Sequence, residues 1–148
     1  MKEYFGVGAI KHLNEILEIE RPKRVLLVTG RSAYADALCS LIKKMFGKVP
    51  YERFSGFNFI PRIENVIEGV NIIREGGYDL IIGIGGGVAM DVAKNIALLS
   101  QQPGDPTQYV FGRNPITCNG LSTVLIPTTA GTGSEATHFA VVYAKKEK

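Results

Sequence analysis

Three consecutive glycines, Gly85, Gly86 and Gly87, constrain this chain more than any other feature of its sequence. They follow an almost wholly aliphatic run at 80–84, which predicts a buried parallel strand, and they precede apolar residues at helical spacing over 88–99. At such a turn the free amide groups of a helix N-terminus, with the helix dipole behind them, can bind a phosphate or pyrophosphate. The alternative is a tight turn that packs a helix closely against a sheet.

The turn departs from two common phosphate-binding motifs. Val88 stands where the last glycine of a G-x-G-x-x-G pattern beginning at Gly83 would be. No lysine followed by serine or threonine ends the segment, so the sequence excludes a P-loop.

Helical and strand patterns alternate along the whole chain. Helices are expected at 10–17, 38–45, 63–73 and 88–99, and strands at 25–28, 49–54, 80–84 and 124–126. The strand at 49–54 alternates apolar and polar residues as an edge strand does, and the prolines and glycines of 101–120 predict a long irregular loop. This alternation predicts an α/β fold, a Rossmann-like and mostly parallel sheet with helices on both faces, in a single nucleotide-binding domain at 1–148.

Ligands of such sheets bind outside the carboxyl ends of the strands. In this chain those ends are followed by Gly30-Arg31-Ser32, by the glycine turn at 85–88 and by the loop after Ile126. The last loop is rich in hydroxyl groups that could contact a ribose or phosphate, namely those of Thr128, Thr129, Thr132 and Ser134. Turn chemistry alone explains some of these hydroxyl residues.

Asp91 and Lys94 lie one turn apart on the helix that follows the glycines. An acidic residue early in a helix interacts well with the helix dipole, and a lysine three residues later can pair with it. Two interpretations are therefore open for both residues: a purely structural role and a role in binding the cofactor.

Composition excludes several classes of protein. The 148 residues are 45% hydrophobic and carry a net charge of only +3, which is typical of a globular chain and not of a nucleic-acid-binding surface. Neither a membrane-spanning apolar stretch nor a signal peptide is visible, so we expect a cytoplasmic protein without membrane partners. Cys39 and Cys118 lack metal-binding spacing and are expected to be reduced thiols.

The sequence offers no complete catalytic or metal site. His12 lies on an early helix and His138 near the end of the chain, and neither has a nucleophile and an acid arranged beside it. The His, Cys and acidic residues are also too few in these segments for a transition-metal site. We therefore predict nucleotide binding without catalytic or metal-ligating residues.

Two long motifs resemble a known family. GGGVAMDVAK at 85–94 is similar to the GGGSxxDxAK signature of the iron-containing, group III alcohol dehydrogenases, and IPTTAGTGSEAT at 126–137 is similar to their second signature. Weaker similarity covers 6–10, 28–30 and 54–70, and TGRSAY together with ATHFAVVY looks most like the phosphonoacetaldehyde reductase branch.

The resemblance implies a fold and a function for the whole enzyme. It implies a dehydroquinate synthase-like nucleotide-binding domain, followed in the full-length enzyme by a C-terminal helical domain whose aspartate and histidines hold Fe or Zn; that domain is absent here. The chain would bind NAD(P) for hydride transfer between nicotinamide and a small alcohol or aldehyde, and would be inactive alone. A dehydroquinate synthase or glycerol phosphate dehydrogenase relative, or a stand-alone non-catalytic nucleotide-binding module, is the alternative. Apolar surface left uncovered by the missing domain predicts self-association, and a homo-oligomer is expected.

By the same resemblance, Gly86, Gly87 and Val88 would hold the pyrophosphate, Asp91 would lie near the nicotinamide, and the hydroxyl residues of 128–134 would line the cofactor. Val88 replaces the usual serine, which removes a hydroxyl but leaves the backbone amide. Gly30 stands where many NAD-preferring members have an aspartate for the ribose hydroxyls. With Arg31 and Ser32 beside it, we expect a preference for NADP(H) over NAD(H).

Overall fold

A computed structural model describes residues 2–30, 36–57 and 60–145. Its four strands, β1 (Val25–Thr29), β2 (Tyr51–Phe54), β3 (Leu80–Gly85) and β4 (Ser122–Pro127), form one sheet in the order β2-β1-β3-β4. Every pairing in this sheet is parallel, which confirms the predicted topology. Strands β2 and β4 form the two edges, as the alternating pattern of 49–54 predicts for β2.

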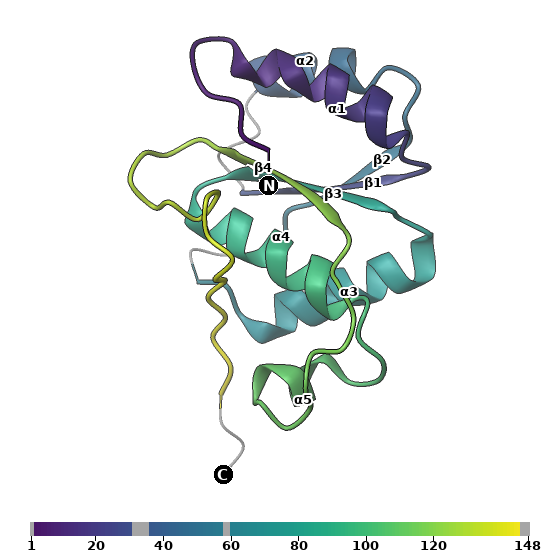
Figure 1. The fold of residues 1–148 in the computed structure, drawn as a ribbon, viewed down its shortest axis with the longest axis vertical. Coiled ribbons are helices and arrows are strands. Elements are labelled where there is room, and N and C mark those ends of the chain that lie inside the picture. The colour runs from purple at the N-terminus through teal and green to yellow at the C-terminus, as the bar shows by residue number, and fades with distance from the viewer. Residues whose placement is uncertain (1, 31–35, 58–59, 146–148) are drawn as a thin grey trace.

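Helices cover both faces of the sheet, as Figure 1 shows. The short η1 (Ala9–Lys11), α1 (His12–Glu20) and α2 (Asp36–Phe46) lie on one side, and α3 (Ile63–Gly76) and α4 (Gly87–Leu99) lie on the other. Gly47 and Gly77 follow α2 and α3 with φ of 56° and 66°. Glycine adopts this left-handed conformation without steric cost, which explains why both helices end where the sequence predicts.

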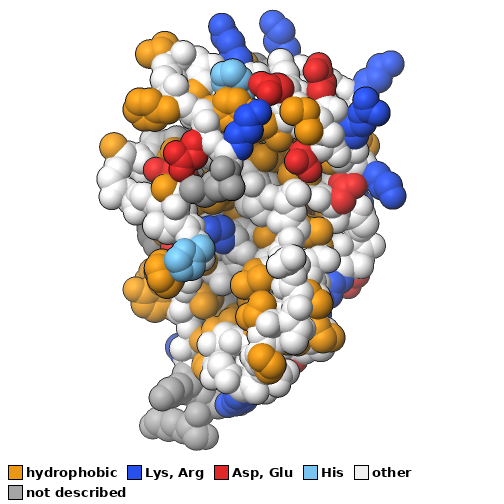
Figure 2. Space-filling model, in the orientation of Figure 1, with side chains coloured by type: hydrophobic (Ala, Val, Ile, Leu, Met, Phe, Trp, Pro, Cys, Tyr) orange, Lys and Arg blue, Asp and Glu red, His pale blue; other side chains and the backbone are white. Residues whose placement is uncertain are grey.

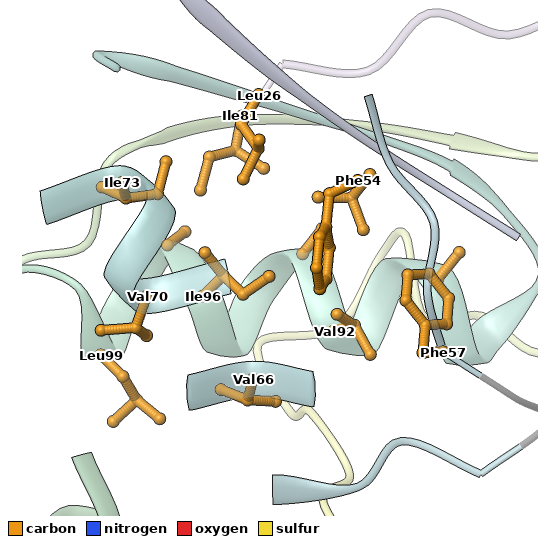
Figure 3. Packing of buried hydrophobic residues seen from close by; sticks show 14 of the residues in the cluster. Leu26, Phe54, Phe57, Val66, Val70, Ile73, Ile81, Val92, Ile96 and Leu99 are labelled. Carbon is orange, nitrogen blue, oxygen red and sulfur yellow. The ribbon is translucent and has the colours of Figure 1, made fainter. Parts of the chain in front are cut away.

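Alternate residues of the central strands enter two separate hydrophobic clusters. Leu26 and Val28 of β1 face α3 and α4. Figure 3 shows Leu26 in this cluster with side chains such as Val66 and Ile96. Val25 and Leu27 face α1 and α2 on the other side. All four side chains are buried, which is why the sequence of β1 is continuously apolar and does not alternate.

The segment at 101–120 contains a helix that we did not expect from its prolines and glycines. Helix α5 (Pro106–Val110) begins where the Asp105 carboxylate accepts a hydrogen bond of 2.9 Å from the backbone amide of Thr107. Pro106 occupies the first turn, where its missing amide hydrogen costs nothing. Acidic capping followed by proline is the signal that could have predicted this helix.

The face of the molecule seen in Figure 2 is divided in charge and polarity. Figure 2 shows charged side chains of both signs gathered at the end that carries α1 and α2, whereas the opposite end is mainly hydrophobic or uncharged. The segment after β4, yellow in Figure 1, exposes Phe139, Val141 and Tyr143 by 53–72%. Within the described ranges, none of the helices is both long and apolar enough to span a membrane.

Candidate functional site

The sheet register aligns three of the predicted ligand-binding segments at one edge. Thr29 of β1 pairs with Ile84, and Gly85 of β3 pairs with Pro127, so Gly30, the glycine turn and the loop after β4 emerge side by side. The backbone amide of Thr128 donates to the carbonyl of Gly85 at 2.9 Å, which joins the turn to the loop. Arg31 and Ser32 lie outside the described residues.

The glycine turn opens directly into the N-terminus of α4. Gly85, the last residue of β3, has φ of 155°, and Gly86 is the N-cap of the helix. No side chain caps this N-terminus, and the first turn of the helix contains no acidic residue. The first amide groups of an α-helix have no partner within the helix, so this end of α4 presents donors and a positive partial charge. Val88 contributes its backbone amide to this end of the helix, as Gly87 does.

The hydroxyl-rich loop lies against the glycines. A Cβ atom at Gly86 would lie 3.1 Å from Oγ1 of Thr129, and one at Gly87 would lie 3.3 Å from Cγ2 of Thr132. Both approaches are tighter than nine in ten contacts of real Cβ atoms. The two glycines therefore allow the side chains of Thr129 and Thr132 to lie close against the start of α4.

Close packing of helix on sheet, the alternative role for this glycine cluster, belongs to a different glycine. A Cβ atom at Gly83 would lie 2.9 Å from Cβ of Ala93 in α4 and 3.0 Å from Cδ2 of Leu125 in β4. Gly83 thus lets α4 rest on the sheet, while Gly86 and Gly87 serve the turn.

Asp91 and Lys94 tie the end of the same loop to α4. Oγ of Ser134 donates to Oδ1 of Asp91 at 2.6 Å, and Nζ of Lys94 lies 3.2 Å from the same carboxylate oxygen. Nζ of Lys94 also donates to the carbonyl of Ser134 at 2.8 Å and to that of Phe139. The predicted ion pair between Asp91 and Lys94 is thus present. Together with the contacts of both side chains to the loop, it forms an anchor that holds the loop on α4. The position of Asp91 near a nicotinamide stays a prediction.

Two further polar residues lie in this region without having been predicted. Nε of Arg53, on β2, donates to Oγ1 of Thr29 at 2.8 Å, beside Gly30. Oε2 of Glu135 is buried and has no hydrogen-bond partner among the described residues. The signal for Arg53 was its position at the end of a strand adjacent to β1, and Glu135 gave no signal beyond its place in the motif.

The described ranges bring together no three His, Cys, Asp or Glu side chains that could hold a metal ion. His138 is exposed and its ring lies 4.1 Å from that of Phe139, while His12 lies 3.2 Å from the Glu15 carboxylate on the surface. Cys39 and Cys118 are free thiols.

Comparison with known proteins identifies the family. The family model described as "Iron-containing alcohol dehydrogenase" matches residues 2–148. The chain belongs to the iron-containing alcohol dehydrogenase family. The family assignment agrees with the two signatures at 85–94 and 126–137, which carry the turn, the loop and the Asp91 anchor.

Relatives in the iron-containing alcohol dehydrogenase family match this chain over most of its length. The long-chain primary alcohol dehydrogenase AdhA of Thermoanaerobacter ethanolicus is 32% identical over 93% of this chain and 36% of the relative. Among solved structures, sulfoacetaldehyde reductase from Bifidobacterium kashiwanohense in complex with NAD+ has a TM-score of 0.82 and 26% identity, covering 90% of this chain and 36% of that protein. An iron-containing alcohol dehydrogenase from Thermotoga maritima is 33% identical with a TM-score of 0.71, covering 84% and 36%. The chain therefore spans little more than a third of these relatives.

Proposed function

We propose that residues 1–148 form the NAD(P)-binding domain of a metal-dependent alcohol dehydrogenase or aldehyde reductase. The observation that carries this proposal is the uncapped N-terminus of α4, which opens at the carboxyl edge of the sheet beneath a loop of hydroxyl residues. A helix end of this kind suits the pyrophosphate of a dinucleotide. The complex of the similar sulfoacetaldehyde reductase with NAD+ supports the same ligand class.

Each part of the site has a role in this proposal. The amide groups of Gly87 and Val88 bind the pyrophosphate, and Gly85 and Gly86 supply the backbone conformation and the space. The hydroxyls of the loop, those of Thr128, Thr129 and Thr132, bind phosphate and ribose oxygens, while buried Ser134 fixes the loop through Asp91. When bound, the nicotinamide supplies hydride chemistry, and this chain orients the ring.

The substrate and the metal of the proposed enzyme are not assigned to any described residue. For the full-length enzyme we propose a small alcohol or aldehyde substrate and a divalent metal, Fe or Zn. The described residues offer no ligand set for that metal, so we assign it no contact with them. A cytoplasmic homo-oligomer is proposed for the same enzyme.

The adenosine end of the site favours NADP(H). Gly30 follows β1 at the place where a carboxylate would bind the ribose hydroxyls of NAD and repel a 2′-phosphate. Without that carboxylate, the 2′-phosphate of NADP(H) meets no repulsion from this position.

Nucleotide titration tests the proposal. We expect the chain to bind NADH and NADPH, and the Gly86→Val variant to bind both at least about tenfold more weakly, because the new side chain meets Thr129 and fills the pyrophosphate space. Gly56→Val is the matched control, since a Cβ there has no neighbour within 4 Å. Absence of binding by the unmodified chain, or unchanged affinity in Gly86→Val, would contradict the proposal.

A further inference from the structure

The segment at 139–144 carries two alternating sets of apolar side chains. Val142 and Ala144 are partly buried and pack against the hydrophobic cluster that α3 and α4 share with the sheet. Phe139, Val141 and Tyr143 point away from that cluster, with exposed fractions of 72%, 53% and 60%. We call these three side chains the outer row. An extended run that is apolar on both sides is typical of a strand covered on both faces, so the outer row is a candidate interaction surface.

Hydrogen bonds hold the backbone of the outer row in place. Side chains of α4 donate to the carbonyls of Phe139 and Val141, the second at 3.3 Å. The backbone of Tyr143 is hydrogen-bonded in both directions to residues 61–63, at 2.7 and 2.9 Å. In Figure 1 the segment is yellow and runs along the outside of the molecule toward the C-terminus. Because its backbone is already fixed, little conformational entropy is lost when a partner covers the outer row.

The chain around the outer row carries little charge. Between Arg113 and Lys145 the sequence contains one charged residue, Glu135, and one oxygen of its carboxylate is buried. Such a surface can face a copy of itself without bringing like charges together, and it offers few charges to a partner that is recognised by charge. The charge pattern therefore favours a second copy of this chain as the partner.

The order of residues in the outer row suits a two-fold axis. Phe139 and Tyr143 each lie two positions from Val141, on opposite sides of it. Two copies can pack their outer rows face to face about an axis at Val141. Each Val141 then meets its equivalent, and each Phe139 meets Tyr143 of the second copy. The row is thus complementary to itself, as a symmetric interface requires.

Hollows lie at both ends of the outer row. His138 and Ala140, on either side of Phe139, line a hollow of about 390 Å³ together with α4 and the start of β4. Tyr143 lines a second hollow of about 210 Å³ together with Ile60, whose side chain is also exposed. The two-fold arrangement brings an aromatic ring of the second copy to each end of the row. These rings therefore find a concave surface to fill.

We propose that two copies of this chain associate through their outer rows about a two-fold axis at Val141. The inference goes beyond the proposed nucleotide-binding function and does not depend on it. Full burial of a Phe or Tyr side chain removes roughly 150–250 Å² from water. The four rings of the dimer, already partly covered, bury on the order of 500 Å², less than half of the roughly 1,200 Å² of a small specific interface. The association is therefore weak and depends on concentration.

Sedimentation equilibrium of the 148-residue chain tests the inference. Between about 1 µM and about 1 mM we expect the mean mass to rise from that of one copy toward that of two. Val141→Lys places two ammonium groups at the axis and should weaken the dimer at least about tenfold. Val7→Lys is the matched control, because it makes the same change at a fully exposed valine outside the outer row, and it should leave the dimer unchanged.

A mixture of two variants tests the symmetry of the contact. Val141→Glu should weaken the dimer as Val141→Lys does, whereas an equimolar mixture of the two brings opposite charges together at the axis. We expect the mixture to associate at least about tenfold more tightly than either variant alone. Both substitutions lie at a half-exposed position, and an unchanged urea midpoint for unfolding confirms that each variant folds.

Three results would each overturn the inference. They are an unmodified chain that stays a single copy at about 1 mM, a Val141→Lys variant that dimerises as tightly as the unmodified chain, and a mixture that gains nothing over its components. The first leaves the outer row to a partner other than a second copy, and the other two place self-association on a different surface. None of them affects the proposed function, which nucleotide titration tests separately.

Discussion

The Ser134 hydroxyl donates a hydrogen bond of 2.6 Å to the Asp91 carboxylate, and this contact joins a side chain of one signature motif to a side chain of the other. The residues lie 43 positions apart in the sequence, one in α4 and one in the loop after β4. Ser134 is buried with 7% of its surface exposed, and the side chain of Asp91 is 14% exposed. This contact therefore holds the loop after β4 against α4, next to the proposed nucleotide site.

Replacing Asp91 by alanine is expected to loosen the loop and destabilise the fold. The buried Ser134 hydroxyl and the Lys94 ammonium group would each lose an acceptor, so the free energy of unfolding should fall by about 1–3 kcal/mol in urea titrations. Asp91→Asn keeps an acceptor oxygen and should lose less. Exposed Glu68→Ala is the control and should change stability by less than about 0.5 kcal/mol. An unchanged midpoint in Asp91→Ala would show that the contact contributes nothing.

Replacing Lys94 by methionine should release the segment that follows the loop. Nζ of Lys94 donates to the carbonyls of Ser134 and Phe139, and methionine has no donor for either. We expect faster amide hydrogen exchange and faster proteolytic cleavage within 134–141, with α1 and β1 unaffected. Lys43→Met, an exposed substitution on α2, should show neither effect. Equal exchange rates in the two variants would be inconsistent with an anchoring role for Lys94.

Tyr78 should make the protein less stable in alkali. Burial, and then a hydrogen bond to the Glu52 carboxylate, raise the pKa of the Tyr78 phenol from 10.0 to about 12. Folding thus favours the protonated phenol, so its contribution is complete below pH 10 and is lost as the pH rises from 10 to about 12. Relative to Tyr78→Phe, the unmodified chain should lose on the order of 2 kcal/mol across this range. Urea unfolding at several pH values measures the difference, and parallel curves for the two proteins would refute it.

The 148-residue chain should bind nucleotide without turning over substrate. We expect no oxidation of NADPH or NADH with small aldehydes, with or without added iron or zinc, because the described residues contain no group of metal ligands. Absorbance of the reduced cofactor measures the reaction, and a full-length relative such as an alcohol dehydrogenase serves as the positive control. Measurable turnover that depends on added metal would contradict this expectation.

Much of the fold could be predicted from local sequence. The aliphatic runs of β1 and β3 require burial on both faces, and this makes a parallel sheet between two helical layers the natural arrangement. Glycines ended α2 and α3 where expected, because only glycine takes positive φ readily. Helix α5 was missed because its five residues are too few for periodicity to show, and only the capping by Asp105 marks it.

The sequence by itself also determined the place of the site. Parallel strands bring their carboxyl ends to one edge, so the glycine turn and the hydroxyl loop had to lie close together. Only the tertiary structure decided which contacts form there. Whether Asp91 faces a ligand or holds Ser134, and whether Arg53 reaches Thr29, depends on strand register and on the angle at which α4 lies on the sheet. Side chains far apart in the sequence meet only when the strand register and the angle of α4 are fixed, because hydrogen bonds act over about 3 Å.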